Sequence, residues 1–212
     1  MTRTPLTSSP PSPHQATLWK NCTVGLLGGS FNPAHEGHRH ISLHALKSLG
    51  LDAVWWMVSP QNPLKSKNDM ASLEDRVAGA VEASRHHPRI IVTDIERLLH
   101  THYTADTLSA LKKHFPRTRF VWLMGTDNLR QIHLWHEWER IFNFVPVAVL
   151  DRPPRGSNVK SCPALERFRA SLRPQEQAPL LKTCRPPAWT ILHIPLNRQS
   201  ATALRKERKL RK

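Results

Sequence analysis

Short apolar runs alternate with segments of helical periodicity along most of the chain. Six of these runs predict buried strands, at 23–27, 53–58, 90–92, 119–124, 145–150 and 189–194. Helices are predicted over 38–49, 72–84, 104–115 and 127–142, and a last helix begins at Ser200. Because the strands are apolar on both faces and alternate with helices, the pattern predicts an α/β protein. Its expected architecture is a Rossmann-like, doubly wound parallel sheet of five to six strands with helices on both faces.

Two proline-rich segments flank or interrupt this pattern. Residues 1–21 are rich in proline and serine and predict a disordered extension, because such a composition buries little apolar area. The domain itself is expected over 22–205. Within it, residues 151–187 hold seven prolines and predict an irregular surface excursion with one short helix near 163–172. Residues 206–212 are expected to form a basic C-terminal tail.

The charge of the chain points to an anionic partner. The 212 residues contain 31 Lys and Arg against 16 Asp and Glu, a formal net charge of +15, of which the eight residues 205–212 supply +5. Three widely spaced cysteines, Cys22, Cys162 and Cys184, give neither a disulfide framework nor a CxxC zinc motif. No apolar stretch is long enough to cross a membrane and no secretory signal opens the chain, so we expect a cytoplasmic protein without a membrane partner.

The most specific segment is the loop after the first predicted strand, GGSFNPAHEGH at 28–38. Ligands of parallel sheets bind at the carboxyl ends of the strands, and the two glycines allow a close backbone approach and positive φ angles. His35 and His38 are three residues apart, so they share one side of the first helical turn, whose free N–H groups attract phosphate. The same field favours neutral imidazoles that donate hydrogen bonds. The segment lacks the glycine patterns of dehydrogenases and P-loop enzymes.

Two further loops carry groups that suit anions. Lys65 lies in a proline-stiffened loop after the second strand, where its ammonium can meet a phosphate or remain solvated on a rigid turn. Thr104 begins a predicted helix, whose N–H groups can hold a carboxylate; a plain helix cap explains the same residue.

Two more segments suit a nucleotide. Asp127 follows Gly125 at the end of the fourth strand, where it can accept both hydroxyls of a ribose or simply cap a helix. Ser200 and Thr202 open the last helix, and Arg205 can fork onto phosphate oxygens, although an ordinary capped helix has the same composition.

Taken together, these segments resemble the nucleotidylyltransferase superfamily with its His-x-Gly-His hallmark, and the bacterial nicotinate-nucleotide adenylyltransferases in particular. The resemblance spans 24–205 and recurs in order at SPQNPLK (59–65), HYTADTL (102–108), GTDNL (125–129), HLWHEW (133–138) and QSATALR (199–205). His102 stands where the family usually has Ser, and Gln199 and Leu204 each replace an Ile. The sequence also ends soon after the last motif, whereas family members usually continue with further helical residues. The packing at the C-terminal end and the formation of a homo-oligomer are therefore open questions at this stage.

The resemblance implies transfer of the adenylyl group of ATP to nicotinate mononucleotide, giving deamido-NAD and pyrophosphate in NAD biosynthesis. It implies Mg²⁺ bound mainly through ATP phosphates, with no metal site built by protein side chains. The implied catalytic residues are His35 and His38. The residues expected at ATP are Gly28, Gly29, Ser30, Phe31, Gly125, Asp127, Ser200, Thr202 and Arg205. Those expected at nicotinate mononucleotide are Lys65, Thr104, Trp135 and Arg152.

Other interpretations remain open at this stage. Trp135 is one of seven tryptophans, so spacing alone favours core packing, whereas the resemblance implies stacking on the nicotinate ring. The acceptor could instead be nicotinamide mononucleotide or phosphopantetheine, although the segments at Tyr103 and Trp135 match the pyridine-nucleotide branch. The net positive charge also suggests a different class of protein, a nucleic-acid-binding module. We disfavour this hypothesis because the basic residues are not interleaved with aromatic ones.

Overall fold

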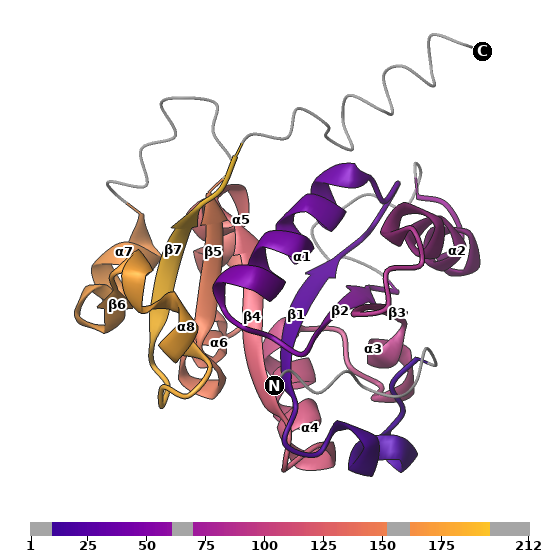
Figure 1. The fold of residues 1–212 in the computed structure, drawn as a ribbon, viewed down its shortest axis with the longest axis horizontal. Coiled ribbons are helices and arrows are strands. Elements are labelled where there is room, and N and C mark those ends of the chain that lie inside the picture. Colours follow the sequence, from indigo (N-terminus) through magenta and orange to yellow (C-terminus); the bar gives the residue numbers. More distant parts are fainter. Residues whose placement is uncertain (1–9, 61–69, 152–161, 196–212) are drawn as a thin grey trace, which may run out of the picture.

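A seven-stranded parallel sheet forms the centre of the protein. The structure is a computed structural model that describes residues 10–60, 70–151 and 162–195 (Figure 1). The strands are β1 Thr23–Gly29, β2 Ala53–Val58, β3 Ile90–Thr93, β4 Arg119–Gly125, β5 Val147–Asp151, β6 Leu172–Arg173 and β7 Trp189–His193. Their order is β3-β2-β1-β4-β5-β7-β6, and every neighbouring pair is parallel. The α/β class is confirmed, with one strand more than expected.

The strand order creates a place for a ligand. The chain runs outward from β1 through β2 to β3, then returns to lay β4 against the other side of β1. The loops that follow β1 and β4 therefore leave the same sheet edge in opposite directions, which opens a crevice in sheets of this type. The loop 28–38 and Asp127 follow these two strands.

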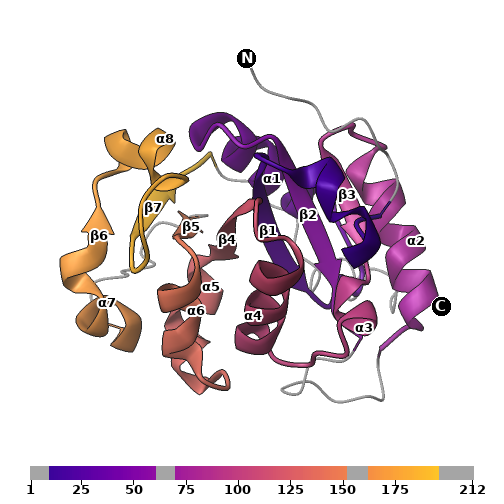
Figure 2. The same cartoon turned by 90° about the horizontal axis from the view of Figure 1, so that it is seen from below.

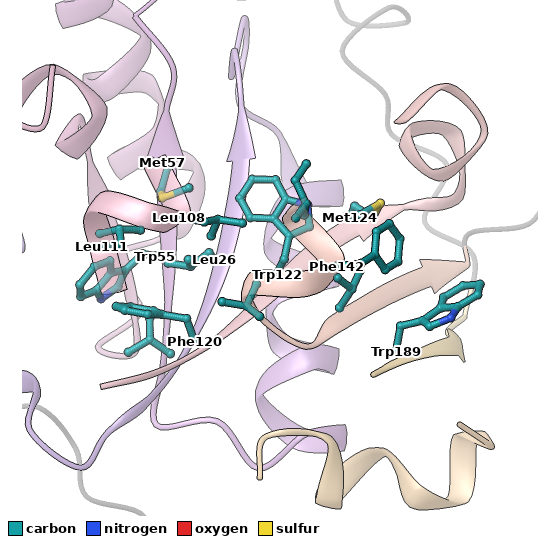
Figure 3. Packing of buried hydrophobic residues seen from close by; sticks show 14 of the residues in the cluster. Leu26, Trp55, Met57, Leu108, Leu111, Phe120, Trp122, Met124, Phe142 and Trp189 are labelled. Carbon is teal, nitrogen blue, oxygen red and sulfur yellow. The ribbon is translucent and has the colours of Figure 1, made fainter. Parts of the chain in front are cut away.

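Helices cover both faces of the sheet, as predicted (Figure 2). One face packs against α1 Glu36–Ser48, α2 Leu73–Ser84 and α8 Ala178–Leu181. The other packs against α3 Ile95–Leu98, α4 Thr104–His114, α5 Thr126–Gln131, α6 Trp138–Phe144 and α7 Pro163–Arg167. Alternation along the strands divides the core, so that Leu26 lies in one cluster and Leu27 in the other. Figure 3 shows the cluster of Leu26, in which Leu108 of α4 packs near Trp55 and Trp122. No helix of the described residues is long and apolar enough to span a membrane.

The extension before β1 is partly folded. The predicted disorder of 1–21 is wrong for Pro13–Trp19, which form a 3-10 helix. Trp19 is buried and meets Trp55 of β2 edge to face, with ring centroids 4.8 Å apart. The composition of the segment did not reveal this contact, because one large aromatic side chain that fills a core position outweighs several prolines around it.

The excursion at 151–187 is more regular than expected where the structure describes it. Its prolines open helices, with Pro163 and Pro179 in the first turns of α7 and α8, where a missing N–H costs little. Between these helices the chain adds β6 to the sheet beside β7, and Ala164, Phe168 and Leu181 are buried. The prediction of an irregular segment is therefore corrected for 162–187.

We predict that Trp19→Ala lowers the free energy of unfolding by about 3–5 kcal/mol, the usual cost of removing a buried Trp side chain. The neighbouring Leu18 is 46% exposed, so Leu18→Ala should change it by less than about 0.5 kcal/mol. Urea unfolding followed by tryptophan fluorescence measures both. Equal effects would show that Trp19 does not belong to the core.

Candidate active site

The two histidines of the first loop cap helix α1 with their own rings. His35 Nδ1 accepts a hydrogen bond from the backbone N–H of Gly37 at 3.0 Å, and His38 Nδ1 accepts one from the N–H of His35 at 3.2 Å. A neutral imidazole that accepts at Nδ1 carries its proton on Nε2. The helix cap thus sets the tautomer of both rings, and each has an Nε2–H donor that the cap does not use.

The core below holds these rings in place. The rings of His35 and His38 lie 3.9 Å apart, and Phe31 lies 4.7 Å from His38 while it stacks on Trp56 of β2 at 5.3 Å. Trp56 Nε1 donates to Ser42 Oγ at 2.7 Å, and Ser42 in turn donates to the carbonyl oxygen of His38 at 2.8 Å. His38 is therefore fixed at its ring and at its backbone.

The unusual backbone angle of this loop belongs to Phe31, not to a glycine. Gly28 and Gly29 are the last residues of β1, whereas Phe31 has a φ of 46°, which its buried ring maintains. The expectation of positive φ at the glycines is wrong. Gly28 is needed for a different reason, because a Cβ there would lie 2.6 Å from Cη2 of Trp122.

A buried arginine that the sequence reasoning missed joins the first two loops. Arg76 of α2 is 3% exposed and donates to the carbonyl oxygens of Ser30 (2.8 Å), Ser59 (2.7 Å), Pro60 (3.0 Å) and Ala71 (3.1 Å). None of these four acceptors is a carboxylate. Burial lowers the pKa of Arg76, and the charge of Glu74 offsets part of that change. The signal was a single Arg among the apolar positions of the 72–84 helix.

The carboxyl end of β4 lies beside this loop. Gly125 is buried at the end of β4, and Asp127 follows in the first turn of α5, where it is exposed. Since β4 pairs with β1 up to Leu27, both residues lie at the sheet edge from which the loop 28–38 leaves. The structure thus brings Gly125 and Asp127 to the same edge as the two histidines.

Trp135 lies at a break between helices. The helical segment predicted over 127–142 is divided into three elements: α5 ends at Gln131, a 3-10 turn follows, and α6 begins after Glu137, which has a φ of 46°. The half-buried Trp135 ring meets Trp122 edge to face, with centroids 6.5 Å apart. Trp122 also fills the space at Gly28, so one buried ring underlies both the β1 edge and Trp135.

The start of α4 lies next to this break. Tyr103 is the N-cap residue, and no side chain of the described residues caps the helix there, so Thr104 is its first residue rather than its cap. The ring of Tyr103 lies 4.4 Å from that of His136, so the residue before Thr104 contacts the residue after Trp135.

A buried carboxyl group lies behind the start of α4. Glu96 of α3 is 6% exposed, and its Oε1 lies 3.3 Å from the hydroxyl of Thr107. Burial raises the pKa of Glu96 to about 7, and hydrogen bonds with the side chains of Ser59 and Thr107 oppose the rise. Like Arg76, this residue was not singled out from the sequence.

Five expected site residues lie outside the described part of the chain: Lys65, Arg152, Ser200, Thr202 and Arg205. Their roles stay predictions. Among the residues that are described, no group of three His, Cys, Asp or Glu side chains could hold a metal ion.

A doubly wound parallel sheet with a helix that begins at its switch point is typical of nucleotide-binding α/β proteins. The model of the cytidylyltransferase-like family matches residues 26–207. The chain is 52% identical over 182 residues to a probable nicotinate-nucleotide adenylyltransferase of Cereibacter sphaeroides, covering 86% of this chain and 96% of that protein. The probable nicotinate-nucleotide adenylyltransferase of Agrobacterium fabrum is 45% identical, and the match covers 88% of this chain and 99% of that protein. The chain therefore belongs to the nicotinate-nucleotide adenylyltransferases of the cytidylyltransferase-like family.

Solved structures support the fold. The Plasmodium falciparum nicotinic acid mononucleotide adenylyltransferase complexed with NaAD superimposes with a TM-score of 0.63 at 18% identity, covering 87% of this chain and 83% of that one. The same enzyme complexed with APC gives a TM-score of 0.62 at 17% identity, with the same coverage.

We predict that Arg76→Gln lowers the free energy of unfolding by about 3 kcal/mol, because several buried carbonyl groups lose a charged donor. Arg97 provides a matched control, since it is exposed and pairs with Asp94 at 2.7 Å. Arg97→Gln should cost less than about 1 kcal/mol. Urea unfolding measures both, and equal losses would contradict a special role of Arg76 in joining the loops.

Proposed function

We propose that this protein transfers the adenylyl group of ATP to nicotinate mononucleotide. The phosphate oxygen of the mononucleotide attacks the α-phosphorus of ATP, the bond to the β-phosphate oxygen breaks, and pyrophosphate leaves with deamido-NAD as the other product. The observation that carries the proposal is the histidine-capped start of α1, where the tautomer of two adjacent neutral rings is set by the backbone.

The chemistry follows from this geometry. His35 and His38 would donate their Nε2–H groups to phosphate oxygens and so stabilise charge on the transferred phosphorus and on the leaving pyrophosphate. Positioning and electrostatic stabilisation can sustain such a transfer without a covalent intermediate. Gly28, Gly29, Ser30 and Phe31 would border ATP, and Gly125 and Asp127 would meet its ribose. Ser200, Thr202 and Arg205 are assigned to the β- and γ-phosphates by resemblance alone.

The acceptor would lie on the other side of the edge. Trp135 offers a half-buried ring for stacking, and the uncapped N–H groups near Thr104 suit the pyridine carboxylate. The contact between Tyr103 and His136, the sequence neighbours of Thr104 and Trp135, supports placing both features at one site. Lys65 and Arg152 are assigned to the phosphorylated substrates by the sequence.

A divalent metal fits the proposal as part of the nucleotide. The described residues offer no three-residue metal cluster, and phosphate oxygens and water are ligands that Mg²⁺ readily accepts. When bound, Mg²⁺ would neutralise charge on the triphosphate. His35, His38 and the start of α1 would still orient the phosphates. A cytoplasmic location and a homo-oligomer stay predictions.

We expect nicotinate mononucleotide to be the best acceptor. The N–H groups at the start of α4 attract a carboxylate more strongly than an amide, because charge-assisted hydrogen bonds are about twice as strong as neutral ones. Pyrophosphate release with ATP should have a kcat/KM at least about tenfold higher for nicotinate than for nicotinamide mononucleotide. No release above background is expected with phosphopantetheine. A preference for either alternative would overturn the assignment of the acceptor.

We predict that His38→Asn lowers kcat for pyrophosphate release by about 100-fold or more, the usual effect of losing one donor to a developing charge. Asn can keep an acceptor near the position of Nδ1 and so retain the cap, but it lacks Nε2. The melting temperature should therefore stay close to that of the wild type. His114→Ala, at the exposed C-terminal end of α4, is the control. Unchanged turnover in His38→Asn would disprove the donor role.

A further inference from the structure

The buried carboxyl group of Glu96 has no part in the proposed chemistry, yet it lies one helical turn behind the expected carboxylate site. Its Oε2 is buried and has no hydrogen-bond partner within the described residues. Building on the proposed function, we infer that Glu96 is a positioning residue of the acceptor site that works in its protonated form. It would hold the start of α4 and keep negative charge away from the nicotinate carboxylate.

The hydroxyl network around Thr107 favours a protonated Glu96. Thr107 Oγ1 lies within hydrogen-bond distance of three oxygens: Glu96 Oε1 at 3.3 Å, the carbonyl oxygen of Tyr103 at 3.1 Å and Thr101 Oγ1 at 2.9 Å. Thr107 has one hydroxyl proton to give. The Tyr103 carbonyl also accepts the backbone N–H of Thr107 at 3.0 Å, and Ser59 bonds to Glu96. The stronger observation is therefore the buried Oε2, which has no partner in the described part of the chain and which an ionised carboxylate would leave without a donor.

A protonated Glu96 fits these contacts. Its O–H donates to Thr107 Oγ1, Thr107 donates to the carbonyl oxygen of Tyr103, and Thr101 donates to the second lone pair of Thr107. Each of the three Thr107 contacts then has a proton. The network ends on Tyr103, the N-cap residue of α4, so it fixes the helix start that would receive the acceptor. Thr101 N–H also donates to the Glu96 carbonyl oxygen at 3.0 Å, which ties the turn to α3.

The charged groups nearby have their own partners or lie on other elements. On α3, Arg97 pairs with Asp94; on α4, Asp106 lies 3.8 Å from Arg140. His100 and His102 lie on the turn before α4. Arg76 binds the carbonyl oxygen of Ser59, and Ser59 lies between it and Glu96. None of these charges contributes to the raised pKa of Glu96, which comes from burial.

The direction of the pH effect follows. Below about pH 7 Glu96 is neutral; above it, the group ionises and repels an anionic ring substituent. The KM for nicotinate mononucleotide should therefore rise about tenfold between about pH 6.5 and 8.5. Nicotinamide mononucleotide carries the same phosphate and ribose but a neutral amide, so its KM, or its inhibition constant against nicotinate mononucleotide, should change much less.

The experiment measures pyrophosphate release by the full chain over this pH range, with both mononucleotides and with wild type, Glu96→Gln and Glu82→Gln. Glu82 is exposed on α2, so its variant should keep the wild-type profile. Glu96→Gln should have a flat KM profile for nicotinate mononucleotide while kcat changes little. A profile in Glu96→Gln that still rises like that of the wild type overturns the inference.

The wild-type comparison decides the matter even if Glu96→Gln does not fold. An equal pH dependence for the two mononucleotides, or none for either, overturns the role of Glu96. Failure of the proposed function looks different, because no mononucleotide then releases pyrophosphate at any pH.

Discussion

The fold of the candidate site depends on how the end of β2 is fixed. Ser59 N–H donates to the carbonyl oxygen of Gly29 at 2.9 Å, its own carbonyl accepts from Arg76, and its side chain bonds to Glu96. Parallel strands leave carbonyl groups without ladder partners where they diverge into loops, and buried groups of this kind require donors. Arg76 supplies them for the loops after β1 and β2 together. The two loops expected to carry the phosphates are therefore anchored to one side chain.

The rings of His35 and His38 both stabilise the start of helix α1 and belong to the proposed catalytic chemistry. Helix starts are usually capped by an oxygen of Ser, Thr, Asp or Asn rather than by a ring nitrogen. His35 and His38 engage Nδ1 in the cap, so the cap places the proton of each neutral ring on Nε2. A proton added at Nδ1 would break the cap, so the helix itself favours the neutral rings. The fold thus maintains the protonation state that the proposed transfer needs.

Local patterns revealed the alternation of strands and helices, because hydrophobic periodicity depends on neighbouring residues. The roles of the site residues at the strand ends stay predictions. Local patterns did not reveal the contacts made across long sequence distances. Trp19 packs on Trp55, and Arg76 reaches back to Ser30. The break at Trp135 was not predicted either, because residues 127–142 contain no proline or glycine to mark it. The missed residues are those whose partners lie on another element.

The two buried ionisable groups at Ser59 explain more about the substrates than the net charge does. Arg76 keeps its charge because the ordinary pKa of a guanidinium is so high that a lowered value still leaves it protonated. A buried carboxyl group starts from a low pKa, so burial can remove its charge near neutral pH, as at Glu96. Below about pH 7 the pair therefore does not cancel, and these two buried groups together carry a net positive charge. An excess of positive charge that is fixed in this way favours two phosphorylated substrates, whereas mobile surface lysines are screened by salt.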